Sequence, residues 1–202
     1  MVDSEVTAIV LAGGGSTRMG QNKALLKLGN KTMIETIIDS LKVLFEHILV
    51  ITNHPEEYNM LKNVKFVKDC VDVGEKNSLI GLYSGLKQSE TAYTFAIGCD
   101  MPFVHIEFIQ YMMDSLKDEA IIVPYINGFY EPLYAIYSND CLGAMDKLIQ
   151  TKNYRISAIF ENVPSKKVTY DEIRIFDSSL ACFKNINTYD VYLKTKHIFE
   201  SI

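Results

Sequence analysis

Two kinds of apolar pattern alternate along the first half of the chain. Short continuous runs, typical of strands buried on both faces, occur at residues 8–12, 48–52 and 93–98. Segments with apolar residues three and four positions apart, typical of helices packed on one side, occur at 32–45 and 77–88. This alternation of strands and helices predicts a parallel sheet with helices covering its faces.

The second half departs from this alternation. Residues 120–125 and 133–137 are both predicted strands, and Asn127-Gly128 between them is a tight-turn signal. A hairpin here predicts one antiparallel strand in an otherwise parallel sheet. The remaining predicted elements are a weak strand at 65–67, helices at 105–117, 142–151 and 156–161, a short strand at 167–169 and a helix from Tyr189.

Together these elements predict an α/β protein with a three-layer α/β/α, Rossmann-like fold, its sheet mostly parallel with one antiparallel strand. The 202 residues contain no repeat, low-complexity tract or linker, so residues 1–202 are expected to form a single domain. Hydrophobic residues make up 48% and charged residues 22%, which favours a globular protein with a sizeable core over a disordered one.

The overall charge and the local charge differ in sign. A formal net charge of −5, from 20 Lys and Arg against 25 Asp and Glu, argues against a nucleic-acid partner bound across the surface. Arg18, Lys23, Lys27 and Lys31 nevertheless lie within one short segment. A basic segment on an acidic protein favours a small anionic ligand.

Cysteine spacing and hydropathy predict the compartment. The four cysteines form no C-x-x-C pair, and the four histidines have no metal-ligand spacing to them, which argues against zinc. No apolar stretch approaches the ~20 residues that cross a bilayer, and no basic region precedes the first apolar run. We therefore expect a cytoplasmic protein with reduced thiols and no membrane association.

A glycine-rich stretch follows the run at 8–12. Its glycines and cations are Gly13, Gly14, Gly15, Arg18, Gly20 and Lys23. Because residues without Cβ atoms let backbone N–H groups approach an anion that cations then neutralise, the pattern predicts a phosphate cradle. The alternative is an ordinary glycine turn between a strand and a helix, with Arg18 and Lys23 merely solvated.

Two common nucleotide motifs are excluded. The Walker pattern needs a lysine directly after its second glycine, but two residues separate Gly20 from Lys23. The dinucleotide fingerprint G-x-G-x-x-G would begin at Gly13 and would need a glycine where Arg18 stands. The predicted cradle is therefore neither a P-loop nor a dinucleotide site.

Asp100 is the second candidate site residue. It follows the buried run at 93–98, so its carboxylate is expected at the same sheet edge as the glycine-rich stretch. Mg²⁺ bridging to phosphate oxygens would need a hard oxygen ligand there. The alternative is a cap or turn aspartate, because Pro102 breaks the chain just after it.

Weaker signals fall on three further places. Asn53 stands at the end of the run at 48–52, which is a binding position in a parallel sheet. Arg155 could clamp a phosphate or lie solvated between two helices, and spacing favours the solvated alternative. Asn187 or Thr188 suits the N-cap of the terminal helix.

Two residue pairs allow local interpretations. Thr32 and Glu35 have the spacing of a capping box, which we favour for Glu35 over ribose binding. Gly81 and Gly85 would expose backbone on one helix face, either for close packing on the sheet or for the approach of a ligand.

Four segments together are specific enough to indicate a family: LAGGGSTRMGQNK at 11–23, CDMPF at 99–103, EPLYAIY at 131–137 and NINT at 185–188. In this order they resemble the molybdenum cofactor guanylyltransferases, the MobA family, within the nucleotide-diphospho-sugar-transferase-like nucleotidyltransferase superfamily. The resemblance spans nearly the whole chain. The first segment alone marks only the superfamily, which includes cytidylyltransferases, and the later segments favour guanylyl transfer.

The resemblance implies roles for particular residues. The implied catalytic residues are Arg18, Lys23 and Asp100, and Gly20 is also implicated in activity. Asp100 is the implied Mg²⁺ ligand. The implied acceptor-binding residues are Arg155, Asn185 and Asn187. Nucleotide binding falls to Leu11, Ala12, Gly13, Gly14, Gly15, Lys23, Asn53, Asp69 and Asp100, of which Asn53 and Asp69 match positions for the guanosine portion.

The implied enzyme is a Mg²⁺-dependent nucleotidyltransferase that transfers GMP from GTP to molybdopterin, or to its molybdenum-loaded form Mo-molybdopterin, and releases pyrophosphate. Cofactor-biosynthesis or molybdoenzyme-maturation proteins are possible partners. The alternatives are a cytidylyltransferase acting on molybdopterin or another small phosphorylated acceptor, and a non-catalytic nucleotide-binding regulatory protein. The chain departs from the family at Asn77-Ser78, where Gly-Pro is usual, and at Tyr189, where proline is usual.

Overall fold

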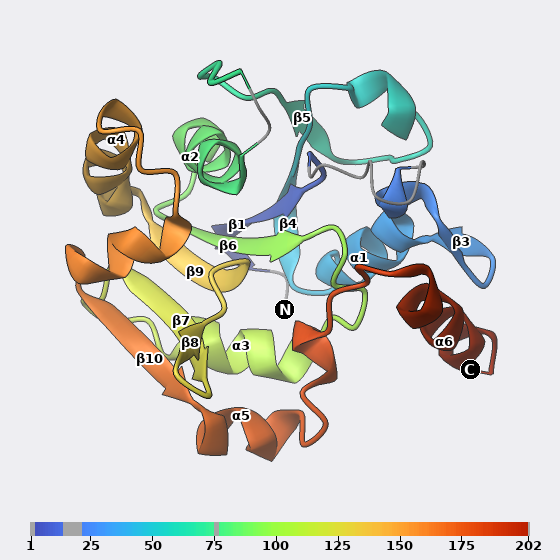
Figure 1. Cartoon of the computed structure of the whole chain (residues 1–202). Coiled ribbons are helices and arrows are strands. Elements are labelled where there is room, and N and C mark those ends of the chain that lie inside the picture. Colours follow the sequence, from blue (N-terminus) through green and yellow to red (C-terminus); the bar gives the residue numbers. More distant parts are fainter. Residues whose placement is uncertain (1–2, 14–21, 75–76, 202) are drawn as a thin grey trace.

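An eight-stranded sheet forms the middle of the molecule (Figure 1). The computed structural model describes residues 3–13, 22–74 and 77–201. Its strands run in the order β10-β7-β9-β6-β1-β4-β5, with β8 paired to β7. They are β1 (Asp3–Leu11), β4 (Phe45–Ile51), β5 (Lys65–Val67), β6 (Tyr93–Gly98), β7 (Ile121–Ile126), β8 (Phe129–Tyr130), β9 (Tyr134–Ser138) and β10 (Ser165–Thr169).

The sheet is parallel except at β9 and at the two-residue β8, which is antiparallel to β7. Strand β1 pairs in parallel with β4 and β6, β4 with β5, and β7 with β10. Strand β9 lies between β6 and β7 and is antiparallel to both. The predicted antiparallel strand is thereby confirmed.

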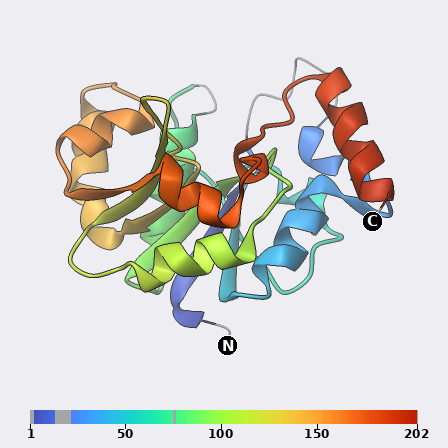
Figure 2. The same ribbon diagram turned by 90° about the horizontal axis from the view of Figure 1, so that it is seen from below.

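Helices cover both faces of the sheet, which confirms the predicted three-layer α/β fold. Figure 2 shows α1, α3 and α5 on the near face, and α2 with α4 lies on the other (Figure 1). The helices are α1 (Met33–Leu41), α2 (Ser78–Gln88), α3 (Ile106–Asp114), α4 (Leu142–Gln150), α5 (Tyr170–Phe176) and α6 (Tyr189–Glu200).

Strand β1 shows how the sequence makes two cores. Ala8 and Val10 point to the core under α1 and α3, whereas Ile9 and Leu11 point to the core under α2 and α4. Successive strand residues face opposite sides, so a strand covered on both faces must be apolar throughout. The continuous run at 8–12 follows from that requirement.

The first predicted helix is shorter than its pattern. Helix α1 ends at Leu41 and β4 begins at Phe45, three residues before the predicted strand. Leu44 and Phe45 are buried in the same core as α1, although they lie beyond its end. The apolar spacing of the helix therefore continues in the sequence after the helix has ended. The capping box is confirmed, because the Glu35 carboxylate accepts from the Thr32 backbone N–H at 2.8 Å.

The predicted antiparallel pairing of residues 120–125 with 133–137 is confirmed, because β9 pairs with the beginning of β7, where Ile121 is opposite Tyr137. The turn differs: Asn127-Gly128 joins β7 to the additional two-residue strand β8. The helix predicted at 105–117 ends at Asp114, and the one at 156–161 is a 3-10 helix, η5 (Ile156–Glu161).

Several short elements were not predicted, among them a hairpin and helix α5. A hairpin forms from β2 (Lys27–Leu28) and β3 (Lys31–Thr32), and α5 follows β10 directly. Thr169 and Glu172 form a second capping box at the start of α5, the same signal that marks α1. Within the described residues, no helix is both long and apolar enough to cross a membrane.

Candidate active site

Strand register places four predicted site residues at one edge of the sheet. Leu11 is in register with Ile51 on one side and with Gly98 on the other, and Ile51 is in register with Val67. Two residues beyond these four positions stand Gly13, Asn53, Asp100 and Asp69. The carboxyl ends of neighbouring parallel strands therefore bring them side by side, which is where ligands bind in open α/β sheets.

Backbone hydrogen bonds continue past the strands and hold the end of β1. The Ala12 N–H donates to the Ile51 carbonyl oxygen at 2.9 Å, and the Cys99 N–H donates to the Leu11 carbonyl oxygen at 3.1 Å. Leu11 and Ala12 are buried, and Gly13 is half-buried. The predicted positions Gly14, Gly15, Arg18 and Gly20 lie outside the described residues.

Tyr58 ties together the residues on either side of that segment. Its hydroxyl donates to the Ala12 carbonyl oxygen at 3.0 Å and accepts from Asn22 Nδ2 at 2.8 Å. Burial raises the pKa of Tyr58 to about 12, so the hydroxyl keeps its proton and remains a donor. The sequence offered no signal for this role, because a single tyrosine among polar residues carries no motif.

Lys23 is held by the C-terminal part of the chain. It opens η2 (Lys23–Leu25), and its Nζ donates to Asn187 Oδ1 at 3.1 Å and to the Asn187 carbonyl oxygen at 3.3 Å. Thr188 is the N-cap of α6, accepting from the Val191 N–H, which leaves the Asn187 side chain free to bind Lys23. The structure thus joins two predicted site residues that lie far apart in the sequence.

Asp100 follows β6 in a half-buried position. Burial raises its pKa, while a hydrogen bond from its own backbone and the charge of Lys23 lower it. A Cβ atom on Gly98 would lie 2.8 Å from Asp100 Oδ1, so a larger residue there would require this carboxylate to shift. The Asp100 carbonyl oxygen accepts from the Ile186 N–H at 2.9 Å, which brings Asn185 and Asn187 close to this edge.

Asn53 and Asp69 form a reciprocal pair. Asn53 Nδ2 donates to Asp69 Oδ2 at 2.8 Å, and the Asp69 N–H donates to Asn53 Oδ1 at 2.9 Å. The pair is partly exposed at the ends of β4 and β5. Each side chain fixes the other, so the remaining carboxylate oxygen of Asp69 presents a positioned acceptor.

The glycines of α2 serve packing on the sheet. A Cβ atom on Gly85 would lie 3.1 Å from Ile9 Cγ1, and one on Gly81 would lie 3.1 Å from Leu11 Cδ2. The latter would also stand 3.9 Å from Asp69 Oδ1. Close approach of α2 to β1 thus explains both positions and brings the helix next to the Asp69 carboxylate.

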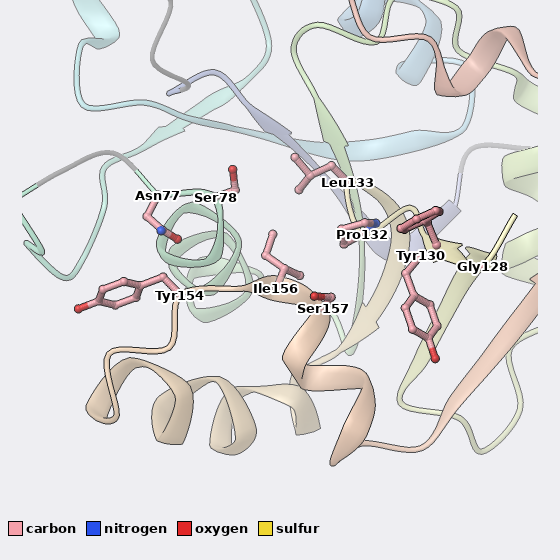
Figure 3. A pocket seen from close by; sticks show the side chains of 10 residues that line it. Asn77, Ser78, Gly128, Tyr130, Pro132, Leu133, Tyr154, Ile156 and Ser157 are labelled. Atoms are coloured by element: carbon pink, nitrogen blue, oxygen red, sulfur yellow. The ribbon is translucent and has the colours of Figure 1, made fainter. Parts of the chain in front are cut away.

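Among the described residues, Arg155 forms no hydrogen bond with the other predicted site residues, and its backbone N–H donates to Asn153 Oδ1 at 3.4 Å. Its side chain is exposed and forms no ion pair within the described part of the chain. Its neighbours Tyr154 and Ile156 line a cavity next to the start of α2 (Figure 3). Among residues 3–13, 22–74 and 77–201, no cluster of three or more His, Cys, Asp or Glu side chains could hold a metal alone.

A three-layer α/β sheet with a lysine, a carboxylate and a glycine-ended strand at one edge defines a nucleotide-binding class of protein. Residues 8–167 match the family described as the MobA-like NTP transferase domain. The chain belongs to this family, which confirms the resemblance predicted from its four sequence segments. The last of those segments, at 185–188, lies beyond the matched residues.

Relatives match over most of their length. The chain is 36% identical over 186 residues to the probable molybdenum cofactor guanylyltransferase of Natranaerobius thermophilus, covering 91% of each chain. It is 31% identical to the molybdenum cofactor guanylyltransferase of Desulfosudis oleivorans, covering 91% of this chain and 90% of the relative.

Solved structures share the fold. Molybdopterin-guanine dinucleotide biosynthesis protein A from Archaeoglobus fulgidus superimposes with a TM-score of 0.84 at 21% identity. The match covers 97% of this chain and 100% of that chain. A putative protein from Aquifex aeolicus gives a TM-score of 0.74 at 27% identity, covering 92% and 94% of the two chains. The first likeness shows the fold alone.

Proposed function

We propose that this protein transfers GMP from GTP to the terminal phosphate of molybdopterin or Mo-molybdopterin and releases pyrophosphate. The observation that carries the proposal is the shared edge at which Gly13, Asn53, Asp69 and Asp100 stand in equivalent positions of four neighbouring strands. The guanylyltransferase names of relatives matched over about nine-tenths of their length support the choice of nucleotide and acceptor.

The reaction requires no nucleophile from the protein. An oxygen of the acceptor phosphate, already anionic at neutral pH, attacks the α-phosphorus of GTP. The new oxygen–phosphorus bond forms as the bond to the bridging oxygen of the β-phosphate breaks, and pyrophosphate leaves with that electron pair. The chain must therefore align two anions and stabilise charge on the leaving group.

Lys23 is the described cation suited to the leaving group. Its ammonium is bound by two oxygens of Asn187, both neutral acceptors that an anionic phosphate oxygen can replace with a stronger, charge-assisted bond. Arg18, within the glycine-rich stretch of the sequence, is proposed as the second cation. The backbone N–H groups of the same stretch are proposed to contact the phosphates.

Asp100 fits a magnesium ion. Mg²⁺ usually binds through one or two carboxylates together with substrate phosphates, so a single carboxylate is a sufficient protein contribution. Burial raises the Asp100 pKa despite the opposing charge of Lys23, and a half-buried carboxylate that forms no ion pair in the described residues is a position that a cation stabilises. When bound, Mg²⁺ would neutralise charge on the phosphates.

The Asn53–Asp69 pair is proposed to select the base. Guanine presents two adjacent donors, N1–H and N2–H, to which a fixed carboxylate is complementary. Cytosine lacks that pair of donors, so Asp69 favours GTP over CTP. A site that hydrogen-bonds one base rejects an analogue that leaves its polar group unpaired.

Nucleotide selectivity tests the proposal most directly. Thermal unfolding with Mg²⁺ and each of GTP, CTP, ATP or UTP should show a rise in Tm with GTP only, because a ligand that binds only the folded state stabilises it. Pyrophosphate release should then require both GTP and molybdopterin. A selective response to CTP would favour the cytidylyltransferase alternative, and GTP binding without pyrophosphate release would favour the regulatory one.

We also propose a cytoplasmic location. Within the described residues the four cysteines, two of them buried, form no disulfide bond, which suits a reducing compartment.

A further inference from the structure

Helix α2 lies across the strands that present the Asn53–Asp69 pair. It packs on β1, β4 and β5 (Figure 1). A Cβ atom on Gly81 would stand 3.9 Å from Asp69 Oδ1, so the inner side of the helix faces this carboxylate. Ser84, three residues further along, lies on the same side because helix residues three apart are neighbours on the surface of a helix. Its side chain is fully buried.

The Ser84 hydroxyl joins α2 to the segment that follows β5. It donates to the Ile80 carbonyl oxygen at 2.7 Å, the usual bond of a serine inside a helix. The same oxygen accepts from the Cys70 N–H at 2.9 Å, and Cys70 Sγ lies 3.4 Å from it. Ser84 therefore binds the backbone of the residue that directly follows Asp69.

Asp69 is thus held through both of its peptide groups. Its own N–H donates to Asn53 Oδ1 at 2.9 Å, and the next N–H along the chain, that of Cys70, donates to Ser84. Because each peptide group is planar, these two bonds fix the two planes that meet at the Asp69 Cα atom. They thereby fix the direction in which the Asp69 side chain leaves the backbone.

The direction of this carboxylate matters for the proposed recognition of guanine. The carboxylate must meet two neighbouring donors, N1–H and N2–H, and hydrogen bonds weaken steeply as their angles depart from linear. A rotation of the peptide group between Asp69 and Cys70 would turn the carboxylate away from one of these donors. Asn53 holds only the peptide group before Asp69 and one carboxylate oxygen, so it does not prevent that rotation.

We propose that Ser84 is a positioning residue that sets the selectivity for guanine. It touches no substrate and acts through the Cys70 N–H on the orientation of Asp69. The inference rests on the proposed function, since guanylyl transfer supplies the guanine base that Asp69 would recognise.

The test compares GTP with ITP, which differs from GTP only in lacking the 2-amino group. Titration calorimetry of the full chain with Mg²⁺ should show tighter binding of GTP than of ITP to the unaltered protein. Ser84→Ala should weaken the binding of GTP about ten-fold and that of ITP about two-fold at most, because the turned carboxylate loses its bond to the 2-amino group. The preference for GTP over ITP should therefore fall.

Ser40→Ala is the matched control. Ser40 lies on α1, on the opposite face of the sheet, and donates to the Thr36 carbonyl oxygen at 3.0 Å, the same bond within a helix that Ser84 makes. This variant should keep the preference for GTP over ITP. Because Cys70 is exposed, water can replace the acceptor that Ser84→Ala removes, and the two variants should have similar Tm values. A lower Tm of Ser84→Ala with an unchanged preference would indicate a structural role and overturn the inference.

A double variant shows whether Ser84 acts through Asp69. Asp69→Ala should lose the preference for GTP over ITP. Adding Ser84→Ala should then change neither affinity further, because coupled residues are not additive. A further loss of GTP affinity, as large as that in the unaltered background, would give Ser84 a route that bypasses Asp69 and would overturn the proposed role.

The inference and the proposed function fail in different ways. An unchanged preference in Ser84→Ala, in a protein that releases pyrophosphate from GTP and molybdopterin, would overturn the role of Ser84 alone. A reduced preference in a protein that releases no pyrophosphate would uphold that role and overturn guanylyl transfer. Equal affinity of the unaltered protein for GTP and ITP would overturn the role of Ser84, because the 2-amino group would then not be recognised.

Discussion

At the scale of single residues, Asn187 restricts the position of the Lys23 side chain. The two hydrogen bonds from the Lys23 ammonium fix a long, flexible side chain near the site before a phosphate arrives. If this is the role of Asn187, it acts through Lys23. If Asn187 instead binds the acceptor directly, the effects of removing the two residues are independent.

A double-mutant cycle distinguishes these roles. Lys23→Ala should lower kcat/KM by about 10²–10³, the loss typical of one group that stabilises developing charge. Asn187→Ala should cost about ten-fold, and the double variant should match Lys23→Ala alone, because coupled residues are not additive. Additive losses would assign Asn187 to the acceptor, and Lys27→Ala, an exposed lysine nearby, serves as the control.

Asp100 couples the site to pH. Its raised pKa means that ionisation destabilises the folded protein, and the destabilisation is complete only above the folded-state pKa. In metal-free buffer at pH 7, Asp100→Asn should therefore have a higher Tm than the unaltered protein. The difference should shrink as pH falls toward the ordinary aspartate value of 3.8.

The same substitution should abolish the effect of magnesium. Mg²⁺ with GTP should raise the Tm of the unaltered protein more than GTP alone, and Asp100→Asn should lose that additional rise. Turnover of Asp100→Asn within ten-fold of the unaltered protein would contradict the role proposed for this carboxylate.

Tyr58 fixes the start and the end of the glycine-rich segment. Tyr58→Phe keeps the buried ring but removes the hydroxyl that binds Ala12 and Asn22. Urea unfolding should show a loss of about 1 kcal/mol in the free energy of unfolding. The KM for GTP should rise while that for the acceptor does not, and an equal rise in both would refute a role confined to this segment.

At the scale of elements, helix α2 depends on its contact with β1. Gly85→Ala should destabilise the protein by about 1–3 kcal/mol, because the added Cβ meets the side chain of Ile9 within a packed core. Gly143→Ala on α4 is the matched control, since nothing lies within 4 Å of its added Cβ.

The two glycine variants should therefore change the free energy of unfolding in opposite directions. Gly143→Ala should stabilise by up to about 1 kcal/mol through the helix propensity of alanine. Denaturant midpoints measure both, and equal effects would show that α2 moves freely on the sheet.

At the scale of the whole molecule, the order of the strands spaces the proposed site residues along one edge of the sheet. Asn53 and Asp69 follow β4 and β5, Asp100 follows β6, and β1 lies between the two groups. Substitutions in the Asn53–Asp69 pair should then affect the proposed nucleotide more than the acceptor, because β1 separates the pair from Asp100.

Asn53→Ala tests this separation from the nucleotide side. It removes a hydrogen bond that orients Asp69, so the GTP KM should rise about ten-fold and the preference for GTP over CTP should decrease. The acceptor KM should stay within two-fold. A rise in the acceptor KM instead would place the acceptor on β4 and β5.

Much of this architecture was predictable from local pattern. The apolar runs at 8–12, 48–52 and 93–98 predicted the central strands, and Thr32 with Glu35 predicted the start of α1. Both signals depend on residues close in sequence: a strand covered on two faces must be apolar, and a helix start must satisfy its free N–H groups. The same reasoning placed Gly13 and Asp100 at one edge.

The sequence by itself thus determined the strands, most helices and the chemistry available at the ends of the strands. Only the tertiary structure decided which distant groups meet: Lys23 with Asn187, Asn53 with Asp69, Tyr58 with Ala12, and Tyr130 with Phe160. Strand order and register create these contacts. Hydrophobic periodicity records which side of an element is buried and carries no information about which neighbour buries it.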